Sequence, residues 1–369
     1  MVVGGRWLFL AVIIPLALRK GLGDRAYPQG CGTKDPSYYD YEQSNLTFPS
    51  SLTLDPDDYR LTRRIGSGKF SDVFEAIGSD GNYVVIKCLK PVSERKIRRE
   101  VLVLQRCRHV ANLARLVGIV IHKETKNHQH MMPSLVLQHA GRDSEWLCHG
   151  EKATPLSDYE IRYYLAHLLV ALDGLHSVGI LHRDVKPRNV LINRQPSAPQ
   201  PLMLIDLGLA DFFLPATPYN VRVASRNYKS PELLTGLEYY DYSIDLWGVG
   251  CILAGLLLHR EPFFRGRNNP DQLMKIVQVL GINDLWAFLH KYNVPLSAEL
   301  QEELQKYDND NTRERQPFVG ASADGLDLLN HLLVYDPDER YTAQQALQHS
   351  YFDLVRERVI REVRYRPSR

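Results

Sequence analysis

Length, composition and charge exclude several classes at the outset. The chain has 369 residues, enough for one large domain or two modest ones with substantial cores. Its 45 Lys and Arg residues nearly balance 43 Asp and Glu residues, so neither a global polyanion-binding field nor a nucleic-acid partner is expected. The five cysteines are scattered without a CxxC pair, which argues against a zinc site and against a disulfide framework.

The first 23 residues form a hydrophobic leader. Its apolar run from Trp7 to Leu18 is too short for a membrane-spanning helix, which needs roughly 20 residues. The run suits the core of a signal peptide, but Arg19 and Lys20 stand where such a peptide is usually neutral. The interpretations that stay open are a signal peptide, a membrane anchor, a transit peptide and a stray upstream extension. Membrane contact is expected only through this leader, if it is retained.

The chain continues with an extended arm over residues 24–58, rich in Tyr, Ser, Pro and Gly. Asn45-Leu46-Thr47 in this arm is a glycosylation sequon, which matters only if the chain enters the secretory pathway. At the other end, residues 353–369 are interpreted as a basic tail.

A glycine-rich turn lies between strand patterns that begin at Tyr59. Gly66-Ser67-Gly68 precedes Val73, and glycines let backbone N–H groups approach phosphate oxygens closely. The alternatives are an ordinary hairpin turn and a dinucleotide-binding turn. A dinucleotide site would need a helix directly after the turn, whereas a strand pattern continues here, so that alternative is excluded.

A strand lysine and a helix glutamate are predicted to pair. Residues 82–89 alternate as a strand does, and Val84-Val85-Ile86-Lys87 has the form of a lysine strand that binds nucleotide phosphates. In the next helix Glu100 falls on an apolar stripe with Ile97, Val101 and Leu104. A buried carboxylate needs a cationic partner, and Lys87 supplies it.

Helical patterns predominate after residue 140. Ser157 and Glu160 form a capping box that opens one helix, and residues 244–258 are apolar nearly all round, as in a helix at the centre of a domain. We therefore predict an α+β fold with a strand-rich lobe to about residue 140 and a helical lobe over 141–352. A ligand is expected in the cleft between them.

Residues 182–189 carry the strongest chemical signal. The sequence His-Arg-Asp-Val-Lys-Pro-Arg-Asn matches the catalytic loop of protein kinases, including the spacing from Asp184 to Asn189. Asp184 takes the position of the carboxylate at the substrate hydroxyl, and Asn189 offers an oxygen of the kind that Mg²⁺ prefers. A lysine two places after Asp184, here Lys186, is typical of serine/threonine kinases. We interpret His182 as structural rather than as a base.

Motifs further along complete a kinase-like set. Asp206 is expected to bridge Mg²⁺ to the phosphates, with Gly208 allowing the turn. Ser230-Pro231-Glu232 stands for the Ala-Pro-Glu motif, with Arg340 as the expected ion-pair partner. In order and spacing, the motifs over residues 59–352 resemble the eukaryotic protein kinase superfamily. The resemblance implies a bilobal kinase domain over that range.

Further segments resemble one kinase family in particular. They are residues 38–42, 89–92, 219–226, 228–232, 261–264 and 271–273. Over residues 38–352 the chain is similar to the catalytic (alpha) subunit of casein kinase II. The resemblance implies a constitutively active kinase that uses ATP, or GTP, with Mg²⁺ and phosphorylates Ser or Thr in acidic contexts. It also implies a regulatory beta subunit in a heterotetramer and a nuclear or cytoplasmic location, or the secretory pathway if the leader is a functional signal.

The kinase register assigns the site residues. The expected catalytic residues are Asp184, Lys186 and Asn189, and the expected metal ligands are Asn189 and Asp206. The expected nucleotide-binding residues are Ile65, Gly66, Ser67, Gly68, Val73, Val85, Lys87, Glu100, His139, Ala140, Leu191 and Ile205. The apolar members are expected above and below the adenine, with hinge hydrogen bonds near His139 and Ala140.

Cations directly before the Ser230-Pro231-Glu232 motif predict the substrate preference. Arg222, Arg226 and Lys229 lie where a kinase reads the residues that follow the phosphoacceptor, and they would attract carboxylates or phosphates. The alternatives are that these cations bind a phosphorylated activation loop or are solvated. We predict that they recognise acidic substrates.

Other functions compete with this prediction. A pseudokinase scaffold keeps the fold without transfer, but it usually lacks one of the catalytic residues, all of which are present here. A proline-directed kinase of the same broad group would lack the three cations. The chain also departs from the resembled family: Ser93 and Glu94 replace cations, Leu137 replaces a Phe and Leu207 replaces a Trp. The first departure predicts weaker selectivity for acidic residues far from the phosphoacceptor.

Overall fold

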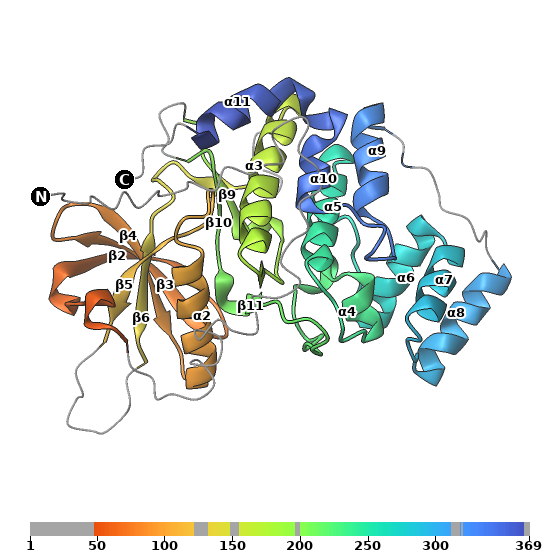
Figure 1. Cartoon of the computed structure of the whole chain (residues 1–369), viewed down its shortest axis with the longest axis horizontal. Coiled ribbons are helices and arrows are strands. Elements are labelled where there is room, and N and C mark those ends of the chain that lie inside the picture. Colours follow the sequence, from red (N-terminus) through yellow and green to blue (C-terminus); the bar gives the residue numbers. More distant parts are fainter. Residues whose placement is uncertain are drawn as a thin grey trace, which may run out of the picture.

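The protein has two lobes, as Figure 1 shows, with strands gathered in one and helices in the other. The computed structural model describes residues 48–121, 132–147, 155–195, 200–310, 318 and 320–364. The predicted α+β, bilobal architecture is confirmed. The leader, the acidic-aromatic segment 38–42 and the sequon at Asn45 lie outside the described residues.

The smaller lobe is built on a six-stranded sheet in the order β1-β5-β6-β4-β3-β2. Its strands are β1 (Thr53–Leu54), β2 (Tyr59–Ser67), β3 (Ser71–Gly78), β4 (Tyr83–Leu89), β5 (Leu116–Val120) and β6 (Ser134–Gln138). Neighbours pair antiparallel except β1, which runs parallel to β5. Gly118 permits this pairing, because a Cβ there would meet the Leu54 side chain at 2.3 Å. The end of the predicted arm thus joins the sheet.

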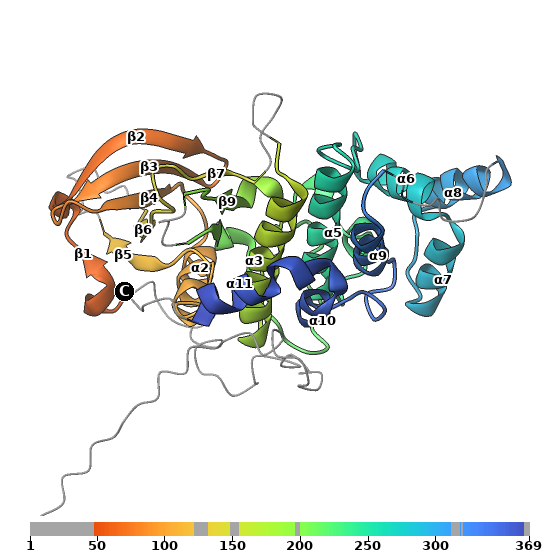
Figure 2. The ribbon, with the colours of Figure 1, turned by 90° about the horizontal axis from the view of Figure 1, so that it is seen from above.

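Helix α2 (Glu94–Arg106) covers one face of this sheet, beside the helical lobe (Figures 1 and 2). The predicted stripe is confirmed, since Ile97, Glu100, Val101 and Leu104 are all buried. The alternation of β4 is confirmed as well: Val84 and Ile86 are buried, whereas Val85 and Lys87 on the other face are half-buried. The apolar face of the helix therefore brings the carboxylate of Glu100 into the interior.

The larger lobe is built around two long buried helices, α3 and α5, with shorter helices around them (Figure 1). The helices are α3 (Asp158–Ser177), α4 (Pro231–Thr235), α5 (Ser243–Leu257), α6 (Asn269–Leu280), α7 (Asn283–Lys291), α8 (Ala298–Asp310), α9 (Ala323–Leu332), α10 (Ala343–Gln348) and α11 (Asp353–Arg364). The capping box at the start of α3 is confirmed. Within the described part of the chain, no helix combines the length and the apolar character needed to cross a membrane.

Short strands position the functional loops between the lobes. They are β7 (Glu145–Trp146), β8 (Ile180–Leu181), β9 (Val190–Ile192), β10 (Leu202–Leu204) and β11 (Asp211–Phe212). β10, β9 and β7 form one antiparallel sheet, and β11 pairs with β8. The predicted catalytic loop therefore lies between β8 and β9, and the segment with Asp206 lies between β10 and β11.

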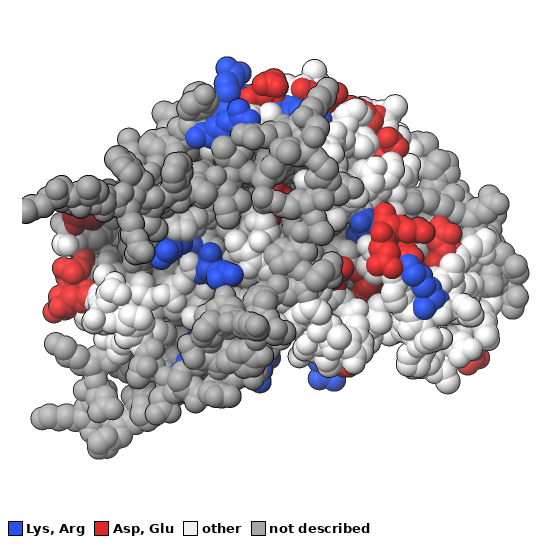
Figure 3. Space-filling model, viewed as in Figure 1, with Lys and Arg blue, Asp and Glu red and all other residues white. Residues whose placement is uncertain are grey.

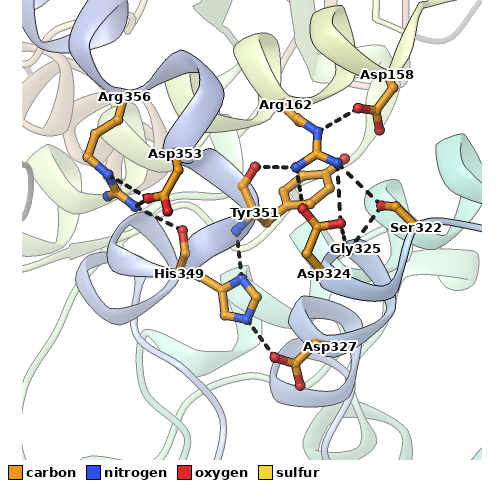
Figure 4. Close-up of polar contacts among 10 residues, drawn as sticks. All are labelled: Asp158, Arg162, Ser322, Asp324, Gly325, Asp327, His349, Tyr351, Asp353 and Arg356. Carbon is orange, nitrogen blue, oxygen red and sulfur yellow. Dashed lines mark hydrogen bonds and ion pairs between the residues drawn. The ribbon is translucent and has the colours of Figure 1, made fainter.

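A buried arginine joins three parts of the helical lobe (Figure 4). Arg162 of α3 donates hydrogen bonds to Asp158, to Asp324 of α9 at 2.5 Å and to the backbone oxygen of Tyr351 at 2.6 Å. Its guanidinium also lies 4.1 Å from the centre of the Tyr351 ring. Because a buried guanidinium needs hydrogen-bonding partners on its several N–H groups, this network fixes α3 against α9.

The described part of the predicted basic tail is helical. Residues 353–364 form the regular helix α11, which packs on α3. Glu362 of α11 accepts hydrogen bonds from Tyr163 at 2.6 Å and His167 at 3.1 Å, and from Arg358 at 2.9 Å. Burial would raise the pKa of Glu362, but these donors outweigh it and lower that pKa to about 2. Apolar residues among the basic ones, such as Val355 and Val359, explain why the segment docks.

Charge on the face shown in Figure 3 is mixed. Lysines and arginines occur in several separate places on it, and a group of acidic side chains gathers over the helical lobe. The distribution on this face agrees with the near balance of charge in the sequence.

A fully buried ion pair joins α4 to the segment before α10, and removal of one partner is expected to be strongly destabilising. The predicted pair is confirmed: Arg340 donates to Glu232 at 2.8 Å, and neither side chain is exposed. Arg340→Met should lower the free energy of unfolding by about 3–5 kcal/mol, because it leaves a buried carboxylate unpaired. Urea unfolding followed by circular dichroism measures the change. Lys291→Met, which breaks an exposed pair with Asp336 and Asp338, is the control and should have a much smaller effect. Equal losses for the two variants would contradict this account.

Candidate active site

The ammonium group of Lys87 joins the two lobes. Its Nζ lies 2.7 Å from Oε1 of Glu100 and 2.9 Å from Oδ1 of Asp206, and the Lys87 side chain is only 11% exposed. The predicted pairing with Glu100 is therefore confirmed. Burial alone would lower the pKa of Lys87, but the two carboxylates outweigh it and raise that pKa above its ordinary value. Lys87 thus stays charged at neutral pH.

Gly208 makes this arrangement sterically possible. A Cβ at residue 208 would lie 3.2 Å from the Asp206 carboxylate, 3.3 Å from the Lys87 ammonium and 3.5 Å from the Glu100 carboxylate. The first two distances are shorter than ordinary contacts, so any side chain there would press on Asp206 and Lys87. Asp206 itself adopts a left-handed backbone conformation with φ of 63° and accepts a hydrogen bond from the Gly208 N–H. The predicted role of Gly208 in the turn therefore has a specific steric cause.

The catalytic loop places a carboxylate among donors. Oδ2 of Asp184 accepts from Lys186 Nζ at 2.5 Å and from the Asn189 side-chain amide at 3.1 Å. Oδ1 accepts from the backbone N–H and the hydroxyl of Ser225, at 2.9 and 3.0 Å. These contacts bring together the three residues that the sequence predicts as catalytic. They also show that Asp184 accepts a hydrogen bond from an aliphatic hydroxyl.

The carboxylate of Asp245, at the start of α5, accepts hydrogen bonds from the backbone of the catalytic loop. It is fully buried and accepts from the backbone N–H groups of His182 and Arg183, both at 2.8 Å, and from the His176 ring at 2.9 Å. Arg183 has a φ of 63°, a conformation that costs a non-glycine residue about 1–3 kcal/mol. The Asp245 contacts offset this strain. The His182 ring contacts the backbone oxygen of Ile205 at 3.1 Å, which agrees with its structural interpretation.

Polar contacts shape the glycine-rich turn between β2 and β3. Asp72 accepts from the Ser67 hydroxyl at 2.7 Å and pairs with Arg64 and with Lys90. Lys90 also donates to the Gly68 backbone oxygen at 2.7 Å. The hydrogen bond from Ser67, with those from the two cations, lowers the pKa of Asp72 to about 2, so the carboxylate stays ionised at neutral pH. The proton of the Ser67 hydroxyl is therefore engaged within the turn.

The predicted adenine-contacting residues divide between the lobes. Ile65, Val73 and Val85 lie on the neighbouring strands β2, β3 and β4. Leu191 and Ile205 are half-buried and pack against the cluster of Ala114, Ala140 and Met203. At the predicted hinge, the His139 ring contacts Glu75 at 3.3 Å and accepts from the Gly141 N–H. Burial lowers the pKa of His139, so its ring is neutral at physiological pH.

These groups have the identity and order of a phosphoryl-transfer site. The family model of the protein kinase domain matches residues 59–352. The chain belongs to the protein kinase family. A kinase domain implies transfer of a phosphoryl group from ATP, usually with Mg²⁺.

The residues of this kinase fit those cofactors. Mg²⁺ takes hard oxygen ligands, which the Asp206 carboxylate and the Asn189 amide oxygen can offer, and Asn189 uses its amide nitrogen for contacts with Asp184. A Cβ at Gly66 or Gly68 would meet other atoms only at ordinary distances of 3.5 Å or more. These glycines are thus not needed for internal packing, and the space beside the turn suits phosphate groups.

The three cations before α4 have different surroundings. Arg222 and Arg226 are exposed, and Arg226 donates to the backbone oxygen of Arg267 at 2.6 Å. Lys229 is only 7% exposed, and its ammonium donates to the backbone oxygens of Val221 and Val223. Burial lowers the pKa of Lys229. The two arginines are therefore accessible to a substrate, whereas Lys229 orders the loop that carries them.

Some functional residues of this site escaped the sequence analysis. Asp72, Asp211 and Asp245 were not singled out. Ser225, which contacts Asp184, has no distinctive pattern of its own. The one signal that could have found Asp245 is its isolation, because a lone carboxylate in an apolar helix must have buried partners.

A second cluster of metal-ligating side chains lies far from this site along the chain, in the helical lobe. Donor atoms of Asp327, His331 and His349 lie within 4.8 Å of one another. Nδ1 of His349 accepts from the Tyr351 N–H at 3.1 Å, so the ring proton lies on Nε2, where Asp327 accepts it (Figure 4). That proton occupies the lone-pair position that a metal ion would need. The cluster is better explained as a hydrogen-bonded link between α9 and the segment after α10.

Substitution of the loop carboxylate should separate chemistry from binding. Asp184→Asn should lower kcat by about 10²–10⁴-fold, the usual range for a lost acid–base and positioning group. Nucleotide affinity should change little, because Asp184 contacts no residue assigned to the phosphates other than Asn189 among the described contacts. Turnover and calorimetric ADP binding measure the two effects. Asp327→Asn is the control, and a near-native kcat for Asp184→Asn would refute the assignment.

Proposed function

We propose that this kinase is an active serine/threonine kinase of the casein kinase II alpha type. It would transfer the γ-phosphate of ATP to Ser or Thr residues that lie in acidic sequences. The observation that carries catalytic competence is the assembled set of Lys87, Glu100 and Asp206, with 2.7 and 2.9 Å between its charged atoms. A pseudokinase scaffold would not need this set, since it serves the positioning of phosphates and Mg²⁺.

The surroundings of Asp184 support a hydroxyl acceptor. Ser225 donates its hydroxyl to Asp184, and Lys186 Nζ donates to the same hydroxyl at 2.8 Å. A carboxylate and an ammonium that converge on one hydroxyl can orient a serine or threonine oxygen in the same way. During transfer, Asp184 would accept the proton of the substrate hydroxyl as the hydroxyl oxygen bonds to the γ-phosphorus, while the bond from that phosphorus to the bridging oxygen breaks and ADP leaves. Lys186 would balance the charge that develops on the transferred group.

Arg222 and Arg226 support the acidic preference. Both are exposed, and both precede the Ser230-Pro231-Glu232 motif, on a segment that would face the residues after the phosphoacceptor of a substrate. Arginine binds carboxylates through paired N–H groups, and each exposed contact is worth about 0.2–1 kcal/mol. The contact between Arg226 and the Arg267 backbone fixes one of the two guanidiniums in advance. A proline-directed kinase would have no use for this pair.

The residues at the start of α2 indicate that the preference is limited to acidic residues close to the phosphoacceptor. Ser93 and Glu94 are exposed at the positions where the resembled family carries cations. Glu94 would repel distant carboxylates of a substrate rather than attract them. Acidic residues close to the phosphoacceptor should therefore count more than distant ones.

Two further proposals rest on the resemblance alone. A regulatory beta subunit would assemble with this chain into a heterotetramer, and GTP would serve as a second phosphoryl donor. Size-exclusion chromatography with multi-angle scattering of the natively purified protein tests the first. A comparison of kcat/KM for ATP and GTP tests the second.

Peptide kinetics test the substrate preference. A peptide set carries one Asp that is moved stepwise away from a Ser, next to a peptide with Pro after the Ser. The Arg222→Ala/Arg226→Ala variant should raise KM for the best acidic peptide by about 2- to 30-fold, since two contacts of about 0.2–1 kcal/mol each are lost. The effect should shrink with salt, because the Debye length falls from about 10 Å at 0.1 M to about 3 Å at 1 M.

The matched control is a neutral peptide, for which the double variant should retain its KM. If wild type and variant rank all peptides identically, the two arginines do not read the substrate. If the proline-directed peptide is preferred, the acidic preference itself is wrong, while the kinase family still holds.

A further inference from the structure

A network of hydrogen bonds runs from the C-terminal helix to the connection between α2 and β5. Oε2 of Glu362 on α11 accepts from the Tyr163 hydroxyl at 2.6 Å and contacts Nε2 of His167 at 3.1 Å. Nδ1 of His167 lies 3.0 Å from the side-chain nitrogen of Asn112, which also donates to the His167 backbone oxygen at 2.9 Å. Tyr163 and His167 belong to α3, against which α11 packs (Figures 1 and 2). The network thus joins three segments that are far apart in the sequence.

The donors and acceptors of this network have one consistent assignment. The amide nitrogen of Asn112 can only donate, so Nδ1 of His167 accepts and the ring proton lies on Nε2. That proton is then donated to the Glu362 carboxylate. Each group therefore orients the next one. Loss of the Glu362 carboxylate would remove the acceptor that this ring proton uses.

The network begins near the surface and ends in the interior. The Glu362 side chain is 32% exposed, whereas His167 is fully buried and Asn112 is 1% exposed. A hydrogen bond between buried groups is costly to leave unmade, because water does not replace the lost partner. On the exposed side, Arg358 donates to Oε1 of Glu362 at 2.9 Å, and its guanidinium lies 4.2 Å from the Tyr163 ring centre. Arg358 thus holds the carboxylate toward α3.

Asn112 is tied directly to the strand that leads to Asp206. Its backbone oxygen accepts from the Leu204 N–H at 2.7 Å, and the Leu204 backbone oxygen accepts from the Ala114 N–H at 2.9 Å. Leu204 ends β10, two residues before Asp206. Asn112 has a left-handed backbone with φ of 59°, a conformation that its surroundings must support. The side-chain contacts of Asn112 with α3 supply that support.

The same connection follows the helix that carries Glu100. Residues 107–115 join the end of α2 to the start of β5. They lie close on α3, since a Cβ at Gly174 would meet the Val110 side chain at 2.8 Å. One face of this connection thus meets α3, while its two ends lead to α2 and the sheet, and its backbone pairs with β10. Its position therefore bears on both carboxylates that contact Lys87.

We propose that Glu362 is a positioning residue for phosphoryl transfer. Through His167 and Asn112 it fixes the connection that links α2 to β10, and so it helps to keep the charged groups around Lys87 in place. The C-terminal helix thereby contributes to activity, although none of the described contacts of Glu362 reaches the candidate active site. The kinetic part of this inference rests on the proposed function, because it requires an active kinase.

Kinetics of variants on α11 test the role of the carboxylate. Glu362→Ala should lower kcat for the best acidic peptide by about 2- to 30-fold, the range for residues that act through a network on a distant site. KM for that peptide should stay near its native value, because the network contacts no substrate group. Glu362→Gln keeps an acceptor oxygen and should retain most of the activity. Glu357→Ala removes an exposed carboxylate from the same helix and is the matched control, with native kcat.

A double variant separates transmission along the network from a general loss of stability. His167→Asn keeps an acceptor near the Nδ1 position for Asn112 but is too short to reach Glu362. The Glu362→Ala change should therefore lower kcat of His167→Asn very little further, because the connection is already broken. Two independent stabilising roles would instead give losses that multiply. If His167→Asn does not fold, the comparison of Glu362→Ala with Glu362→Gln decides the question.

Hydrogen exchange reads the far end of the network without any need for activity. The Leu204 amide, which donates to the Asn112 backbone oxygen, should exchange slowly in wild type. Mass spectrometry of peptides that contain Leu204 should show faster exchange in Glu362→Ala than in wild type, Glu362→Gln or Glu357→Ala. Peptides from the buried helix α5 should exchange alike in all four proteins, which distinguishes local loosening from global destabilisation.

The outcomes distinguish this inference from the proposed function. A wild type that phosphorylates no peptide would overturn the proposed function, and hydrogen exchange would still test the network. A folded Glu362→Ala with native kcat, losses that multiply in the double variant, or unchanged exchange at Leu204 would each overturn the role of Glu362. The chain would still belong to the protein kinase family in every case.

Discussion

A buried ammonium group between two carboxylates is the interaction on which the active arrangement of this kinase depends. Lys87 can remain charged in the interior only because Glu100 and Asp206 lie within 3 Å of it. Glu100 belongs to α2 and Asp206 to the helical lobe, so the same charge balance sets the position of a helix and the relation of the two lobes. Glycine suits residue 208 because a Cβ there would lie 3.2 Å from the Asp206 carboxylate and 3.3 Å from the Lys87 ammonium, closer than ordinary contacts.

The same principle recurs throughout the site. Asp245 anchors the strained backbone of Arg183, Asp211 neutralises its guanidinium, and Glu232 pairs with Arg340 in the core. Each pair costs hydration energy when it is buried and is stabilising only as a complete set of hydrogen bonds. This explains why the elements of the site are mutually dependent. Loss of one partner leaves a buried charge that the remaining structure cannot satisfy.

Much of this could be predicted from the sequence, because the decisive signals are local. The spacing of Asp184 and Asn189, the stripe that includes Glu100 and the strand that carries Lys87 each lie within one short segment. Asp211 and Ser225 could not be found in this way. Their roles arise from contacts with residues that are distant in sequence, and an aspartate or serine in a loop is by itself unremarkable. Likewise, the composition of residues 353–369 indicated a basic tail, and only the docking of Val355 and Val359 on the core reveals a helix.

We propose above all that this protein transfers phosphate to serine and threonine residues in acidic sequences. The most direct test identifies which residues it phosphorylates in a mixture of proteins. A dephosphorylated mixture of protein fragments is incubated with ATP and Mg²⁺ and either wild type or Asp206→Asn, and the phosphorylated residues are identified by mass spectrometry. The account predicts that wild type alone yields phosphorylated serines and threonines, most of them with acidic residues close after them. Identical products from the two proteins, or products without acidic neighbours, would contradict it.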